Sequence, residues 1–282
     1  MRSGQIALAV TLTLDGVKQL GGNPVQLEIS GPFSRTASGF ETDLAASVSI
    51  GSSSAHLALD LLPGRLYLGI DGTFYKLPGR FSPSLGATGA TGALGALGID
   101  ADGWLEDPHA LGTAEVGGVQ TDHLSAKLDV SKLLAQAAKL LGSGGVSGAT
   151  GALGALGGAT GASGALGALG ALGPNAVLSL IGQAITSARV DIYTGTADHV
   201  VRELKLAIGF AVPSLASGAL GGLTGGSFDL DATLTQLNQP QTIAPPASYQ
   251  PASGILNGIY DLESQFGSLA SLFAGSSGSL AS

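Results

Sequence analysis

The chain has 282 residues, with 12 basic side chains against 20 acidic ones, a formal net charge of −8 and no cysteine. Glycine supplies 46 residues and charged side chains only 11%, whereas an average protein has roughly 7% glycine and about 25% charge. This composition excludes a coiled coil, a disulfide scaffold and a cysteine-ligated zinc site. The acidity disfavours nucleic acid as a partner, and the length suits one large domain or two small ones.

Alternation of apolar and polar residues predicts a run of antiparallel strands in the first part of the chain. Leu66, Leu68 and Ile70 follow this spacing and lead into Asp71-Gly72, a dipeptide typical of two-residue hairpin turns. Each of these strands is expected to bury one face. The strands predicted here cover 5–14, 25–30, 40–50, 57–61, 66–70 and 73–77.

The same spacing returns in the second half of the chain. In its longest run the side chains of Leu204, Leu206, Ile208 and Phe210 share one face. Further strands are predicted over 116–128, 187–194, 199–212 and 228–236, so about ten result. No alternation of parallel strands with helices is present, which argues against a Rossmann-type enzyme.

Three helices are predicted between and after these strands. Asp129 is suited to cap the first, over 130–141, whose apolar stripe includes Leu133 and Leu134. The others cover 174–185 and 255–273, and 275–282 is expected to be a frayed tail. The predicted fold class is therefore mainly β (α+β): a single domain over 1–282 with one strongly curved antiparallel sheet, a half-barrel, and a few helices packed on its concave face.

Two low-complexity inserts, at 86–98 and 142–173, carry glycine at nearly every third position and no charge. A collagen-like triple helix is disfavoured because neither insert is rich in proline. A membrane-spanning helix is disfavoured because glycine dilutes the apolar content and is a poor helix former. The inserts are therefore interpreted as flexible loops expanded by repeat slippage.

No catalytic motif for a nucleophile, a phosphate or a metal is present, so the protein is not expected to be an enzyme or to need a cofactor. Asp122-His123 and Asp198-His199 look like charge-relay pairs, but neighbours in a strand point to opposite faces and do not pair directly. The single tryptophan, Trp104, is interpreted either as an anchor for the loop after the first insert or as a residue at the mouth of a cavity.

Three stretches resemble actinobacterial cell-envelope lipoproteins of the LppX/LprG type: 66–77, 117–134 and 237–246. The resemblance extends over about 5–246 without the inserts. It implies a LolA/LppX-like half-barrel that holds lipid or acyl chains in an apolar cavity between sheet and helices, for lipid or lipoprotein transport. It also implies a location in the cell envelope or outside the cell.

Two departures from that family stand out. Its members usually begin with a secretory signal and a lipobox cysteine, whereas this sequence enters a predicted strand by Gln5. A misplaced start codon, a chain trimmed to the mature domain, or a member without an anchor would each account for this. The second departure is the pair of inserts, which fall beside elements that would line or cover the cavity.

The leading hypothesis is a non-enzymatic envelope protein that binds lipid or acyl chains, with envelope membrane or lipoprotein partners. Because the same side chains would also form a solid core, the alternative is a structural or interaction module of this fold that docks to envelope partners. A hydrolase ranks third. The predicted cavity lining is Leu66, Leu68, Ile70, Trp104, Leu133, Leu134, Leu204, Leu206, Ile208 and Phe210.

Overall fold

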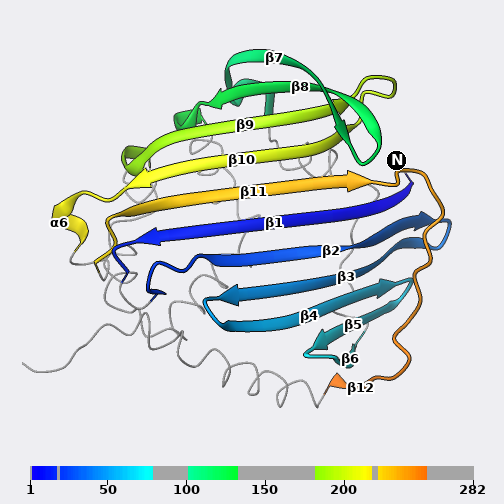
Figure 1. Cartoon of the computed structure of the whole chain (residues 1–282). Coiled ribbons are helices and arrows are strands. Elements are labelled where there is room, and N and C mark those ends of the chain that lie inside the picture. Colours follow the sequence, from blue (N-terminus) through cyan, green and yellow to red (C-terminus); the bar gives the residue numbers. More distant parts are fainter. Residues whose placement is uncertain (1, 18–19, 79–100, 133–181, 218–221, 253–282) are drawn as a thin grey trace, which may run out of the picture.

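A computed structural model describes residues 2–17, 20–78, 101–132, 182–217 and 222–252, which form one open, curved sheet (Figure 1). The 12 strands lie in the order β12-β6-β5-β4-β3-β2-β1-β11-β10-β9-β8-β7, and every neighbouring pair is antiparallel except β12 with β6. The mainly β half-barrel expected from the sequence is confirmed. The strands are β1 Ser3–Asp15, β2 Val25–Thr36, β3 Gly39–Ile50, β4 Ser53–Leu62, β5 Arg65–Ile70, β6 Thr73–Leu77, β7 Leu105–Val116, β8 Val119–Leu128, β9 Ile185–Gly195, β10 Val201–Ala211, β11 Gly225–Thr235 and β12 Gln250–Pro251.

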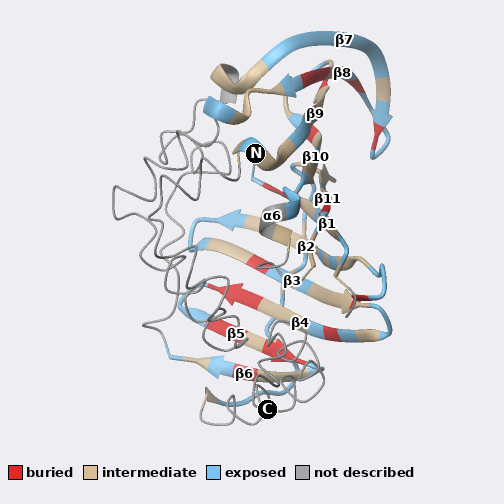
Figure 2. Cartoon of the chain, turned by 90° about the vertical axis from the view of Figure 1, so that its left-hand side faces the viewer, coloured by how far each residue is buried: buried red, intermediate tan, exposed pale blue. Residues whose placement is uncertain are grey.

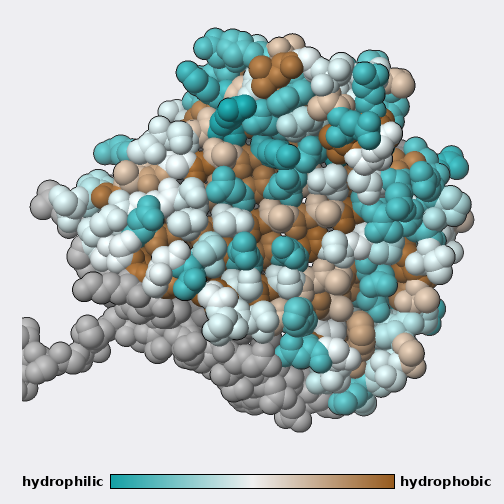
Figure 3. Space-filling view, in the orientation of Figure 1, coloured by the Kyte–Doolittle hydropathy of each residue, from teal (hydrophilic) through white to brown (hydrophobic). Residues whose placement is uncertain are grey.

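The register divides the sheet into an apolar face and a polar face. Residues paired across antiparallel strands point to the same side, so each pairing extends a row of side chains across the sheet. Rows on the apolar face consist of Leu, Ile, Val and Ala over most of its width. The other side, the polar face, carries most of the charged side chains and faces the viewer in Figure 3.

The expected strands are all present, and two strands, β7 and β12, were missed. The stretch predicted as one strand over 116–128 is the end of β7, a turn at Gly117 and Gly118 with φ of 57° and 79°, and β8. β7 itself is not apparent in the sequence because its pairing with β8 shifts register twice, around Pro108 and near Gly112. Two bulges break the alternation on which strand prediction depends.

Described helical structure is short: η3 (Ala101–Trp104), α6 (Ser214–Ser217), and single turns at 130–132 and 182–184. The turn at 130–132 begins where expected, since the Lys132 backbone N–H donates to Asp129 Oδ1 at 3.0 Å. The rest of the helix over 130–141, most of that over 174–185, the helix over 255–273 and both inserts lie outside the described residues. No helix within the described ranges is long and apolar enough to cross a bilayer.

Most of the buried apolar residues lie at the β4–β6 end of the sheet (Figure 2). Beyond β11, residues 236–251 form what we call the C-terminal strap, which passes the ends of β2–β5 and reaches the β6 edge as β12 (Figure 1). Its first part is fixed to β1, where Ser3 Oγ donates to the Gln239 carbonyl at 2.6 Å and Gln5 Nε2 to Gln241 Oε1 at 2.7 Å. The buried apolar side chains of β4–β6 are Ala55, Leu61, Leu62, Leu66, Tyr67, Ile70 and Tyr75.

Candidate functional site: the apolar face of the sheet

The candidate site is built from two adjacent rows of side chains that cross most of the sheet. Successive side chains on one face of a strand are about 7 Å apart, so the two rows together form a continuous apolar strip. Neither row contains a charged residue. The first consists of Ile70, Leu57, Ala46, Ile29, Leu8, Ala232, Leu204, Ile192 and Leu124; the second of Ala55, Val48, Leu27, Val10, Leu230, Leu206, Val190 and Ala126.

The middle of this strip is only partly covered. Ile70 and Ala55 at one end are 5% and 2% exposed, and Val190 and Ala126 toward the other end are 6% and 5% exposed. Between them, on β2, β1, β11 and β10, every member of both rows keeps intermediate exposure. Apolar side chains in the centre of a twelve-stranded sheet would be expected to be the best covered, so their residual exposure singles out the centre of the apolar face.

The residues predicted to line a cavity fall into two groups on this one face. Leu66 and Ile70 on β5 are 6% and 5% exposed, and Leu68 between them is partly exposed. β10 carries the second group, which consists of Leu204, Leu206, Ile208 and Phe210, and all four are partly exposed. Five strands separate β5 from β10, which corresponds to about 29 Å along the sheet at ~4.8 Å per strand. Leu133 and Leu134 lie outside the described residues.

Trp104 lies at the end of η3, directly before β7. Its backbone carbonyl accepts a hydrogen bond from the Asp129 N–H at 2.7 Å, which joins the start of β7 to the end of β8. The ring is half-buried, and its Nε1 is buried without a hydrogen-bond partner among the described residues. A buried indole N–H usually finds an acceptor, and none lies within the part of the chain that the structure describes.

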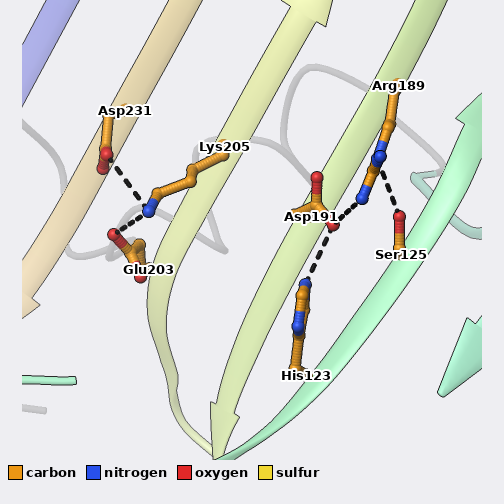
Figure 4. A network of polar contacts seen from close by, with 7 residues as sticks. All are labelled: His123, Ser125, Arg189, Asp191, Glu203, Lys205 and Asp231. Atoms are coloured by element: carbon orange, nitrogen blue, oxygen red, sulfur yellow. Dashed lines mark hydrogen bonds and ion pairs between the residues drawn. The ribbon is translucent and has the colours of Figure 1, made fainter. Parts of the chain in front are cut away.

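Charged chemistry is concentrated on the polar face, in a network across β8–β11 (Figure 4). His123 Nε2 lies 2.9 Å from Asp191 Oδ1, and Arg189 Nη2 donates to the same oxygen at 3.0 Å. Arg189 Nε donates to Ser125 Oγ at 3.0 Å. His123 therefore pairs across the strands rather than with its neighbour Asp122, as the alternation of strand faces requires.

This network contains serine, histidine and aspartate but not the geometry of a hydrolase triad. In a triad the histidine contacts both the nucleophile and the acid. Here the Ser125 hydroxyl is bonded to Arg189, while His123 bonds to Asp191 and stacks on Tyr193 with ring centroids 4.2 Å apart. These contacts therefore give Ser125 a structural partner and no activating base within the described part of the chain.

Electrostatic effects in the network are those of paired surface groups. Burial tends to raise the pKa of Asp191, but hydrogen bonds from Arg189, His123 and Ser125 together hold that pKa below its usual value. Hydrogen bonding to Glu203 raises the pKa of Lys205, whose ammonium lies 3.0 Å from Glu203 and 3.6 Å from Asp231. Both effects stabilise the charged forms.

Beside the network lies a pocket of about 310 Å³ on the polar face, floored by Ala9 and Ala207 and flanked by Asp191, Lys205 and Asp229. No group of three or more histidine or acidic side chains among the described residues is arranged to hold a metal ion. Sequence reasoning missed this network because its pairs become visible only when the registers of β8 with β9 and of β9 with β10 are known.

Comparisons with known proteins give a similarity of structure only. No protein-family model matches the sequence, and no curated protein sequence matches it either. Among solved structures, the lipoprotein LppX of Mycobacterium tuberculosis is similar at 10% identity and a TM-score of 0.37, over 86% of this chain and 90% of that one. LprF of Mycobacterium bovis is similar at 10% identity and a TM-score of 0.35, over 88% and 90%. The MucA/MucB complex of Pseudomonas aeruginosa follows at 10% identity and a TM-score of 0.27, over 88% of this chain and 57% of that one.

Proposed function

We propose that this protein binds a lipid or acyl chain against the centre of its apolar face, without covalent chemistry. The observation that carries the proposal is the pair of uncharged apolar rows, which keep residual exposure on β2, β1, β11 and β10. The proposed location is the cell envelope, where the lipoproteins that the sequence resembles are found. Delivery of the bound chain to an envelope membrane or lipoprotein partner is the corresponding role in transport.

The dimensions and energetics of the strip fit such a ligand. The second row crosses eight strands, or about 34 Å at ~4.8 Å per strand. An acyl chain spans about 15 Å in one leaflet of a bilayer, half of the hydrocarbon core. Each CH₂ group that such a chain buries contributes about 0.8 kcal/mol, so contact along part of one row is sufficient for binding without any polar anchor.

Native mass spectrometry after mild purification, followed by addition of oleic acid, tests the proposal. Wild-type protein is expected to carry or take up adducts of lipid mass. Leu206→Glu places a carboxylate in the centre of the second row, and uptake is expected to fall at least tenfold because a buried unpaired charge is strongly unfavourable. The matched control is Ala207→Glu, the next residue of β10, which is exposed and points to the polar face.

The outcome of this pair of variants separates the two functions derived from the sequence. Loss of uptake in Leu206→Glu with uptake retained in Ala207→Glu supports a ligand site on the apolar face. A wild-type protein that shows a bare mass and takes up no oleic acid contradicts it. Unfolding of Leu206→Glu alone, with no uptake by the wild type, would support the alternative of a structural module with a filled core.

A further inference from the structure

Two aspartates face each other on the polar face at the β3–β6 end of the sheet. Asp43 on β3 and Asp60 on β4 are register partners, so their side chains leave the sheet side by side. Asp43 is exposed, whereas Asp60 is only 3% exposed. Asp60 Oδ1 is buried and has no hydrogen-bond partner in the described part of the chain. Burial of a carboxyl group in this position disfavours its negatively charged form.

The next strands continue the same row toward the C-terminal strap. Tyr67 on β5 is the register partner of Asp60 and is 1% exposed, and Lys76 on β6 is the register partner of Tyr67. Tyr249 of the strap packs its ring 5.1 Å from that of Tyr67, and the Lys76 ammonium lies 5.7 Å from the Tyr249 ring centroid. Immediately after Tyr249 the strap pairs with β6 as β12. The strap is therefore seated on Tyr67, the register partner of Asp60.

We infer that the Asp43–Asp60 pair is a proton-dependent latch for the C-terminal strap: with one shared proton the strap stays seated on Tyr67, and loss of that proton loosens its seat. Protonated Asp60 donates to the Asp43 carboxylate and leaves one charge in the pair. Removal of the proton places two like charges side by side, one of them buried next to Tyr67. Opening of the strap relieves this by admitting water to Asp60.

The surroundings of Asp43 and Asp60 favour a bound proton over a paired cation. Burial is the main cause that raises the pKa of Asp60 to about 6, and the charge and hydrogen bonding of Asp43 raise it further. Neither cation nearby is paired with Asp60: Lys76 lies over Tyr249, and Arg65 is exposed. On β2 the residues between the pairs Ser30–Ala45 and Phe33–Thr42 are Gly31 and Pro32, neither of which titrates. The titratable or charged groups that face the pair are Glu41 on β3, Arg65 and Tyr67 on β5, Lys76 on β6 and Tyr249 on the strap.

The consequence is a local opening confined to one end of the strap. The first part of the strap is tied to β1 through bonds from Ser3 and Gln5, none of which involves a group that titrates near neutral pH. Only the part that contacts Tyr67 and β6 is expected to respond. Opening there exposes the edge of β6, which β12 otherwise pairs. This inference does not depend on the proposed lipid binding.

Hydrogen–deuterium exchange of the full chain at about pH 5 and about pH 7.5, corrected for the intrinsic rate, tests the latch. Amides of 73–77 and 249–252 are expected to lose protection at the higher pH. The loss is expected to match the factor by which opening of the strap weakens proton binding at Asp60, about tenfold for a tenfold weakening. The Asn238 amide, which donates to the Ser3 carbonyl at the fixed part of the strap, is expected to stay unchanged. Equal protection of 73–77 at both values would overturn the inference.

Three variants make the test specific. Asp60→Asn cannot titrate and is expected to keep the strap protected at both values. Asp43→Asn keeps the buried carboxyl but removes the like charge, so the loss of protection is expected to be smaller and to be complete at a lower pH. Asp229→Asn, an exposed carboxylate on β11, is the matched control and is expected to behave as wild type. A pH response retained in full by Asp60→Asn, or an unshifted response in Asp43→Asn, would contradict the latch.

Discussion

The two ends of the sheet are built from the same alternating pattern but differ in how their faces are covered. At the β3–β6 end the side chains of Leu61, Leu66, Ile70 and Tyr75 are 5–6% exposed. On the polar face of this end the C-terminal strap packs on Tyr67. On β10 and β11 the apolar side chains are partly exposed. The β4–β6 end is thus a packed core, whereas β10 and β11 belong to the partly exposed centre of the apolar face.

The acidic groups of the polar face show the same contrast. Burial without a cation raises the pKa of Asp60 to about 6 at the β3–β6 end. At the other end Asp191 is also partly buried, but hydrogen bonds from Arg189, His123 and Ser125 hold its pKa below the usual value. The pKa values of two aspartates on one face of one sheet are therefore displaced in opposite directions. The difference shows that local partners and burial, and not the fold as a whole, set the pKa of each carboxylate.

Truncation of one leucine at each end gives the largest expected difference. Leu61→Ala removes a side chain that is 5% exposed and leaves a cavity in the packed end, so the free energy of unfolding is expected to fall by about 3 kcal/mol. Leu206→Ala removes a partly exposed side chain on β10, and a loss of only about 1 kcal/mol is expected. Urea denaturation of ligand-free protein measures both. Equal losses would mean that β10 is packed as tightly as β4.

Replacement of the buried aspartate gives the next largest effect, and in the stabilising direction. The pKa of Asp60 is raised from 3.8 to about 6 in the folded state, so the folded chain binds the proton more tightly than the unfolded chain. The contribution of Asp60 to stability is therefore fully present below about pH 4, is lost as pH rises to about 6 and is constant above it. At about 1.4 kcal/mol for each tenfold difference in proton affinity, this shift corresponds to about 3 kcal/mol at about pH 8. Asp60→Asn is expected to gain about 2 kcal/mol of it, because the buried asparagine amide still carries part of the desolvation cost.

The measurement is the urea midpoint of both proteins between about pH 4 and about pH 8. The two curves are expected to diverge as pH rises, because only the wild type accumulates a buried charge. A constant offset between the two curves would show that the asparagine side chain changes stability through packing alone. The difference in aspartate pKa between the two parts of the sheet would then not account for the effect.

Asp191→Asn should have the opposite dependence on pH. Because the folded pKa of Asp191 is lowered, its contribution to stability is present above its unfolded value and is lost as pH falls through the folded one. The variant is expected to lose about 1 kcal/mol at neutral pH, since Arg189 and His123 lose a charged acceptor. At low pH the two proteins should approach each other. Thermal unfolding at about pH 7 and about pH 3 checks this, and a deficit that grows on acidification would contradict it.

The sequence was sufficient to predict the strands because alternation is a local signal. Where the alternation is broken, as in β7 with Pro108 and two register shifts, prediction failed. Asp71-Gly72 was recognised as a turn from two residues, and its φ values of 45° and 83° confirm the hairpin. Asp129 was likewise recognised as a helix cap from its position alone, and its bond to Lys132 confirms it.

Properties that depend on register and on distant segments could not be predicted. The pairing of His123 with Asp191 requires knowledge of how β8 lies against β9. The placement of Asp60 between Asp43 and Tyr67 depends on the registers of β3, β4 and β5, and the packing of Tyr249 on Tyr67 depends on a segment far along the chain. The division of the predicted lining into a packed group on β5 and a partly exposed group on β10 depends on coverage, which no single strand encodes. The lining as a whole stays a prediction.

Replacement of Lys205 on β10 should have the smallest effect on stability, and that small effect is informative. Its ammonium contacts Glu203 and Asp231 and lies 5.5 Å from the Tyr193 ring centroid, but its side chain is 44% exposed. Surface pairs of this kind contribute about 0.5 kcal/mol or less, so Lys205→Gln is expected to change the urea midpoint little, and less still in high salt. If Lys205→Gln instead cost more than Asp191→Asn, the polar face over β9–β11 would be more enclosed than the exposure of its side chains indicates. The contrast with the strap-covered end would then be one of residue type and not of coverage.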